Sequence, residues 1–122
     1  MDIRTYLKDN LLLFDGGMGT LCAEKIPESV GSPCELLNLT HPEQIAAIHK
    51  EYIEAGSKAI KTNTFGANAL AMDTVTCRQV IETGFKIADK FAGEAYIFAD
   101  IGPISVTDSG DINEQYRLVI DM

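Results

Sequence analysis

An acidic residue followed by glycines stands directly after an apolar run in the stretch "LLLFDGGMGT", residues 11–20. Asp15 can accept a hydrogen bond from an ammonium group. Gly16 and Gly17 leave their backbone N–H groups open to a carboxylate, because no Cβ atom blocks close approach. This combination suits the zwitterionic head of an α-amino acid. The alternative is an aspartate that caps a turn built from the two glycines.

The same glycines do not make a nucleotide-binding loop. Their spacing, G-G-x-G, differs from the dinucleotide motif G-x-G-x-x-G, and no Lys-Ser/Thr pair follows. The net charge of −8 also argues against a nucleic-acid partner, which would require a basic surface to meet phosphates. A self-contained flavodoxin-like or nucleotide-binding sheet is therefore disfavoured.

A second group of polar residues lies in "TNTFG", residues 62–66. Side chains alternate between the two faces of a strand, so Thr62 and Thr64 are expected on one face and Asn63 on the other. The threonine hydroxyls either bind a ligand or satisfy nearby backbone groups. The sequence leaves both interpretations open.

The cysteines and histidines give no evident metal site or nucleophile. Cys22, Cys34 and Cys77 are odd in number and widely spaced, which fits a reducing compartment better than a disulfide framework. They lack the short spacing of a local zinc site. His41 and His49 are eight residues apart, and we expect them to be surface or packing residues.

Periodicity predicts a repeating order of strand and helix. A short polar helix is expected at 3–9, and the apolar run 11–14 is expected to form a strand buried on both faces. Thr40 and Glu43 have the spacing of a capping box that starts the next helix. The remaining elements are helices over 40–56, 76–93 and from 111 onward, strands within 58–66 and 94–103, and a loop at 104–110.

Repeated strand–helix units predict an α/β fold with a parallel sheet and right-handed crossovers. Sites in such sheets lie at the carboxyl ends of the strands. The three expected strand ends read "DGGMGT", "TNTFG" and "DIGP". All three carry small or polar residues, so we expect a small-molecule site where they meet.

The length of 122 residues fits one domain of common size. No apolar run approaches the roughly 20 residues that span a bilayer, so no membrane partner is expected. The polar N-terminus lacks the apolar core of a signal peptide. We therefore expect a cytoplasmic protein.

Taken together, the motifs resemble a known family. "LLLFDGGMGT", "CELLNLTHPEQIAAIHKEYIEAGSKAIKTNTFGAN" and the later "IGP" are similar to the N-terminal part of the homocysteine S-methyltransferase domain. That domain opens cobalamin-dependent methionine synthases and bacterial proteins that join it to a methylenetetrahydrofolate reductase. Betaine–homocysteine methyltransferases are more distant relatives. The resemblance covers essentially the whole chain.

The resemblance implies a (β/α)₈ barrel that transfers a methyl group to the sulfur of homocysteine and yields methionine. In this family zinc binds the homocysteine thiol and holds it as a thiolate. The methyl donor is methylcobalamin, which methyltetrahydrofolate supplies, or betaine or S-methylmethionine, according to the branch.

The resemblance also assigns roles to residues. Asp15 matches the family aspartate that meets the substrate amino group, and Gly16, with Gly17 beside it, matches the glycine whose amide meets the carboxylate. Thr62 matches a threonine that holds the same head, with weaker roles for Asn63 and Thr64. The zinc cysteines of the family lie further along the domain, so Cys22, Cys34 and Cys77 do not match them. Asp100 stands where relatives more often have a small residue; it either adds a carboxylate to the rim or bonds a loop amide.

Such a barrel needs about 250 residues, so residues 1–122 supply about three of its eight βα units. The helix that begins at Asp111 is still on period at Met122, which favours a truncated barrel. We therefore expect an inactive piece that pairs with the remainder of the barrel or with itself through an open sheet edge. The alternative is a non-enzymatic module that binds an amino acid or pairs with a barrel partner.

Overall fold

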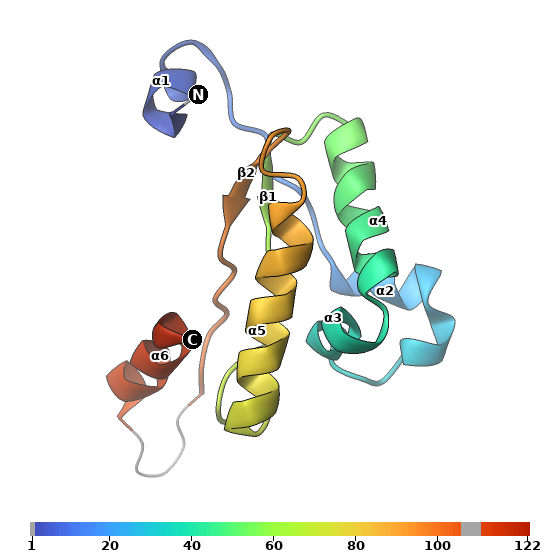
Figure 1. Ribbon diagram of the computed structural model, residues 1–122, viewed down its shortest axis with the longest axis vertical. Helices are drawn as coiled ribbons and strands as arrows, with labels where there is room; N and C mark the ends of the chain where they lie inside the picture. Colours follow the sequence, from blue (N-terminus) through green and yellow to red (C-terminus); the bar gives the residue numbers. More distant parts are fainter. Residues whose placement is uncertain (1, 106–110) are drawn as a thin grey trace.

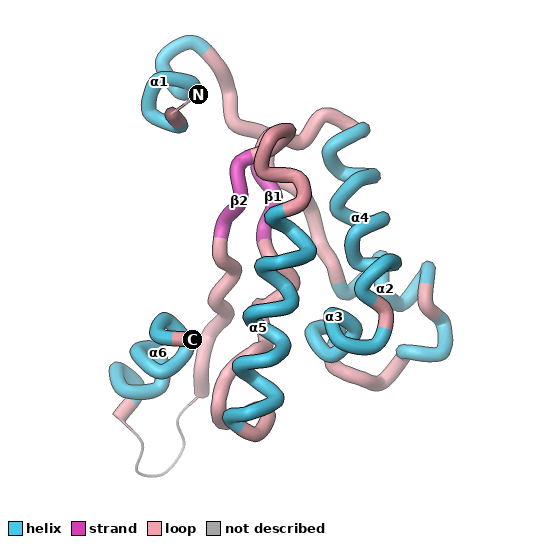
Figure 2. The backbone as a smooth tube through the Cα atoms, viewed as in Figure 1, coloured by secondary structure: helices cyan, strands magenta, loops and turns pink. Residues whose placement is uncertain are grey.

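The computed structural model describes residues 2–105 and 111–122, and it is a mixed α/β fold (Figures 1 and 2). The predicted loop at 104–110 lies outside the described residues from residue 106 onward. The helices are α1 (Ile3–Asp9), α2 (Gly19–Lys25), α3 (Leu37–Thr40), α4 (Pro42–Glu54), α5 (Thr74–Asp89) and α6 (Ile112–Asp121), with short 3₁₀ helices η1 (Pro27–Ser29) and η2 (Cys34–Leu36). The strands are β1 (Ala59–Lys61) and β2 (Tyr96–Phe98).

The two strands pair in parallel, as the strand–helix order predicted. Ala59 lies opposite Tyr96 and Lys61 opposite Phe98. Helix α5 makes the connection between them, and α4 leads into β1 (Figure 1). Ile60 of β1 is fully buried in a cluster with Ala88 of α5, and the partly buried Ile53 of α4 packs against it. The sheet therefore rests on both long helices.

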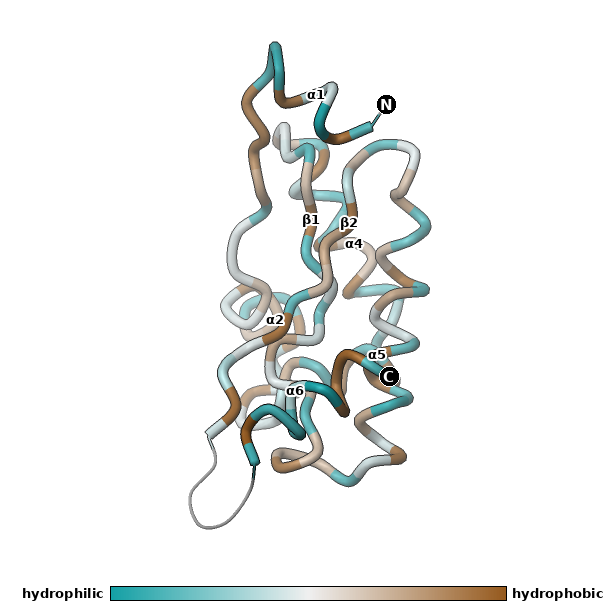
Figure 3. Tube along the Cα trace, turned by 90° about the vertical axis from the view of Figure 1, so that its left-hand side faces the viewer, coloured by the Kyte–Doolittle hydropathy of each residue, from teal (hydrophilic) through white to brown (hydrophobic). Residues whose placement is uncertain are grey.

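The prediction of a doubly buried strand at 11–14 is wrong. The backbone forms only one isolated parallel bridge, between Phe14 and Ala59. Leu11 is 94% exposed and Leu13 is 57% exposed. The run lies along the outer edge between α1 and α2 (Figure 3). An apolar run is buried on both faces only if neighbouring elements cover it, and the described part of this chain covers little of Leu11 and Leu13.

The capping box at the start of α4 is also wrong. The helix begins at Pro42 with His41 as the N-cap, and no side chain caps it by a hydrogen bond. The Thr40 hydroxyl instead lies 2.8 Å from Nδ1 of His41. Pro42 occupies the first turn, where its missing N–H donor costs nothing because that donor has no helical partner.

None of the described helices is long and apolar enough to cross a membrane.

The fold predicts that Gly84 of α5 tolerates no side chain. A methyl group there would lie 2.9 Å from Asn38 Nδ2 and 2.9 Å from Thr64 Cγ2. The gain of about 1 kcal/mol in helix propensity is outweighed by overpacking, which costs about 1–3 kcal/mol. Gly84→Ala should therefore lower the free energy of unfolding in urea. Gly93→Ala is the matched control, because no atom lies within 4 Å of its added methyl; equal stability of the two variants would contradict the packing.

His49 of α4 predicts a loss of stability in mild acid. The ring is fully buried against Phe91, and neither ring nitrogen has a hydrogen-bonding partner among the described residues. Burial lowers the pKa of His49, although the charge of Asp15 opposes this. The unfolded chain therefore takes up the proton first, and stability falls as the pH drops through about 6.5.

Urea unfolding between pH 7.5 and 5.5 measures this effect. His49→Leu should flatten the pH dependence over that range, whereas His41→Gln, which leaves His49 in place, should retain it. A slope that survives in His49→Leu would show that other groups cause it.

Candidate functional site

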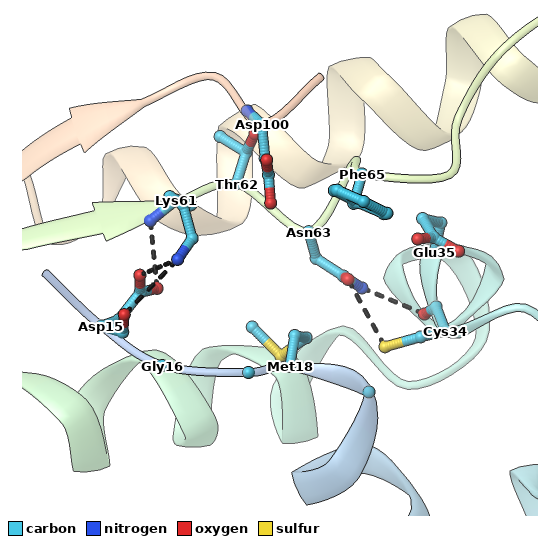
Figure 4. Close-up of a pocket in the computed structure, with 12 residues that line it drawn as sticks. Asp15, Gly16, Met18, Cys34, Glu35, Lys61, Thr62, Asn63, Phe65 and Asp100 are labelled. Atoms are coloured by element: carbon cyan, nitrogen blue, oxygen red, sulfur yellow. Dashed lines mark hydrogen bonds and ion pairs between the residues drawn. The ribbon is translucent and has the colours of Figure 1, made fainter. Parts of the chain in front are cut away.

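The three expected strand ends meet around one open cavity of about 530 Å³ (Figure 4). Its walls come from the segment after the apolar run, from the end of β1, from the segment after β2 and from η2. The cavity thus lies at the carboxyl end of the parallel strands, where the topology predicted it. It is lined by Asp15, Gly16, Gly17, Met18, Gly19, Cys34, Glu35, Lys61, Thr62, Asn63, Phe65 and Asp100.

Five of the six predicted site residues line this cavity. They are Asp15, Gly16, Gly17, Thr62 and Asn63. Thr64 does not line it; it lies instead on the wall of a second, smaller and mainly apolar cavity beside α6. Sequence reasoning missed Lys61, Cys34, Glu35 and Phe65 as parts of the wall. Lys61 had a usable signal, since it directly precedes Thr62 at a strand end.

The carboxylate of Asp15 is held by one residue, Lys61. Its carboxylate accepts a hydrogen bond of 3.0 Å from the Lys61 backbone N–H through Oδ2. Its other oxygen, Oδ1, lies 3.0 Å from the Lys61 ammonium, which makes an ion pair without aligned hydrogen-bond geometry. The Asp15 side chain is 2% exposed and that of Lys61 is 34% exposed. A buried carboxylate of this kind requires a cation nearby.

Gly16 allows Tyr52 of α4 to approach the backbone of the loop. A Cβ at position 16 would lie 2.9 Å from the Tyr52 hydroxyl oxygen. That hydroxyl donates a 2.7 Å hydrogen bond to the carbonyl of Gly17. Gly17 itself has only one atom within 4 Å of an added Cβ, Oγ1 of Thr20 at 3.9 Å. The first glycine thus fixes the loop on α4, while the second leaves space beside the cavity.

The side chains of Thr62 and Thr64 bond to each other and to the backbone, although both residues lie beyond the end of β1. Their hydroxyl oxygens are 2.7 Å apart. Thr62 Oγ1 accepts a 3.2 Å hydrogen bond from the backbone N–H of Asp100, and Thr64 Oγ1 donates a 2.7 Å hydrogen bond to its carbonyl. Both hydroxyls thus satisfy backbone groups of Asp100, and a role of Thr62 in ligand binding stays a prediction. They tie the segment after β2 to the end of β1.

Asn63 is fixed by a buried amide network. Its Nδ2 donates to Asn38 Oδ1 at 2.9 Å and to the carbonyl of Cys34 at 3.0 Å. Asn38 Nδ2 in turn donates to the carbonyl of Asn63 at 2.8 Å and to that of Val80 at 3.0 Å. These four hydrogen bonds join α3, η2 and α5 to the end of β1.

Asp100 and Glu35 add acidic groups to the cavity wall. Burial raises the pKa of Asp100, the Lys61 ammonium lowers it, and the charges of Asp15 and Glu35 raise it. Glu35 Oε1 accepts a 2.8 Å hydrogen bond from the Gly66 N–H. Of the two roles that the sequence left open for Asp100, a rim position is the one observed. Lys61 is the only cationic side chain on the wall of this cavity among the described residues.

The thiols do not fit a zinc site. Cys22 Sγ and Cys34 Sγ lie 2.9 Å apart, but Cys77 packs in a different hydrophobic cluster. Burial raises the pKa of all three thiols, whereas zinc binds thiolates. In the described part of the chain no group of three or more His, Cys, Asp or Glu residues is arranged to hold a metal ion.

Comparison with known proteins identifies the family. The family model described as homocysteine S-methyltransferase matches residues 12–119. The chain belongs to this family. The predicted resemblance is therefore confirmed, and it extends from the apolar run before Asp15 into α6.

Two relatives within this comparison are informative. Methionine synthase from Mycobacterium tuberculosis is 30% identical over 118 residues, covering 84% of this chain and 10% of that protein. The crystal structure of the homocysteine methyltransferase MmuM from Escherichia coli, in a metallated form, superposes with a TM-score of 0.74 at 18% identity. That match covers 98% of this chain and 53% of the MmuM chain. The chain thus spans about half of one relative's length and a tenth of the other's.

The amide network predicts that Asn38 is essential for stability. Asn38→Ala removes three hydrogen bonds and leaves buried polar groups of Asn63 and Val80 without these partners, at about 1–3 kcal/mol per unsatisfied group. Urea unfolding should show a loss of at least about 2 kcal/mol. The matched control is Asn113→Ala on the exposed surface of α6, which should change stability by less than about 0.5 kcal/mol. Similar losses in both variants would contradict the assigned role.

Proposed function

We propose that residues 1–122 form about three βα units of a homocysteine S-methyltransferase barrel and hold the amino-acid head of homocysteine. The observation that carries this proposal is the cavity at the strand ends. It combines a buried carboxylate at Asp15, the glycine backbone at 16 and 17, and one cation at Lys61. Those groups match the ammonium and carboxylate of an α-amino acid.

The reaction in this proposal is methyl transfer to the homocysteine thiolate, which yields methionine. Zinc supplies the chemistry that activates the thiol in this family, and the described residues do not fit the metal. This chain's own part is to bind and orient the substrate head. Methylcobalamin, betaine and S-methylmethionine all remain compatible donors. We therefore expect no turnover from this chain alone with homocysteine, zinc and a methyl donor.

Exposed apolar residues support a second part of the proposal, which is that this chain associates with a partner. Leu11 and Leu13 are largely exposed, and Leu118 and Ile120 of α6, which are 40% and 67% exposed, add apolar surface. In a closed barrel further strands and helices would cover such surfaces. We propose the remainder of the barrel as the partner, with self-association through the same edge when that remainder is absent.

Titration with homocysteine, followed by NMR of the backbone amides, tests the binding proposal. Homocysteine should shift the amide signals of Gly16, Gly17 and Asn63 in a saturable manner, whereas propanethiol, which lacks the charged head, should not. Gly17→Leu places a side chain beside the cavity and should abolish the shifts.

Gly93→Leu, far from the cavity wall, is the matched control and should bind like the unmodified chain. Equal shifts with propanethiol, or shifts that survive in Gly17→Leu, would exclude this cavity as the site of the amino-acid head.

A further inference from the structure

The carboxylate that the proposed function gives to the substrate ammonium is already occupied by Lys61. Oδ2 of Asp15 accepts from the Lys61 backbone, and Oδ1 lies 3.0 Å from the Lys61 ammonium. A substrate ammonium therefore cannot pair fully with Asp15 while Lys61 stays in place. Figure 4 shows the two side chains facing each other at one end of the cavity.

We propose that Lys61 is a substrate-binding residue that works by exchange. The substrate ammonium replaces the Lys61 ammonium at Asp15, and the released Lys61 pairs with the substrate carboxylate. This inference rests on the proposed function, since it concerns how the same cavity takes the amino-acid head. It assigns to Lys61 the recognition of the carboxylate.

The two partners differ in their freedom to move. The Asp15 side chain is 2% exposed, and backbone hydrogen bonds hold it on both sides: its N–H donates to the Ala59 carbonyl at 2.9 Å, and the Lys61 N–H donates to its Oδ2. The Lys61 side chain is 34% exposed, and its Nζ lies over the Phe14 ring, 6.0 Å from the ring centroid. Lys61 can therefore swing away while the carboxylate of Asp15 stays fixed.

The charges of the cavity favour this exchange. The wall carries three carboxylates, those of Asp15, Glu35 and Asp100, and only one cation among the described residues. A substrate carboxylate entering beside three acids needs that cation as its partner. A zwitterion brings one charge of each sign, so Asp15 and Lys61 each keep an opposite partner before and after the exchange. A ligand with only one of the two charges leaves one group unpaired.

Two half-ligands, each with only one charge of the homocysteine head, test the two ion pairs of the exchange separately. The amine 3-mercaptopropylamine keeps the thiol and ammonium of homocysteine, and 4-mercaptobutyrate keeps the thiol and carboxylate. Lys61→Met removes the competitor at Asp15, so it should bind the amine about fivefold more tightly and the carboxylate about fivefold more weakly than the unmodified chain. The dissociation constants are measured by NMR titration in the presence of a phosphine reductant.

Asp15→Asn gives the reciprocal measurement without leaving a buried charge. It releases Lys61, so 4-mercaptobutyrate should bind about fivefold more tightly and 3-mercaptopropylamine more weakly. Lys61→Arg keeps the cation and should retain carboxylate binding. Lys58→Met, an equal loss of charge at an exposed site outside the cavity, is the matched control and should leave both constants unchanged.

The outcomes separate this inference from the proposed function. Opposite changes for the two half-ligands in Lys61→Met and Asp15→Asn support the exchange. Homocysteine binding by the unmodified chain, together with unchanged half-ligand constants in both variants, overturns the exchange and leaves the proposed function standing. If no protein binds any of the three ligands, the proposed function fails and the exchange fails with it. Should Lys61→Met not fold, the Asp15→Asn arm decides alone.

Discussion

The amide network between Asn38 and Asn63 is the interaction on which the site depends. Both side chains are buried, and their four hydrogen bonds join the end of β1 to α3, to α5 and to the segment that carries Cys34. Buried amides are tolerated only when their donors and acceptors are satisfied, which restricts this region to one arrangement. That arrangement positions the part of the cavity wall that is formed by Lys61, Thr62, Asn63 and Phe65.

A second constraint comes from charge. A carboxylate as buried as that of Asp15 needs a cation. The chain supplies that cation from Lys61, the last residue of β1. In the proposed function, the cation that pairs with Asp15 thus lies where the substrate head binds. Under that proposal, the groups that bind the substrate head are the same groups that pair with each other in the described structure.

Apolar side chains are buried on the helix-covered side of the sheet, whereas they are exposed at its open edge. Ile45 and Ile48 of α4 and Val80 of α5 are fully buried, so these faces of the long helices are covered within the described chain. Leu11 and Leu13 are not covered in the same way. This asymmetry supports the proposal that the chain forms part of a larger barrel, and the chain spans 53% of the MmuM chain.

The amino-acid sequence by itself determined the order of elements, the parallel pairing and the end of the sheet at which the polar residues gather. These follow from local periodicity and from the geometry of strand–helix–strand units, which need no knowledge of distant contacts. Asp111 as the N-cap of α6 is of this kind, because its side chain accepts from the N–H of Asn113, two residues away.

Only the tertiary structure decided what each side chain contacts. The run at 11–14 has the composition of a buried strand, but burial depends on neighbours that the described chain does not place there. Lys61 pairs with Asp15 across 46 residues, and Asn38 meets Asn63 across 25. Such contacts depend on how the helices pack, so residue types and local spacing predicted the place of the site, while the folded chain alone revealed which of its groups are already paired.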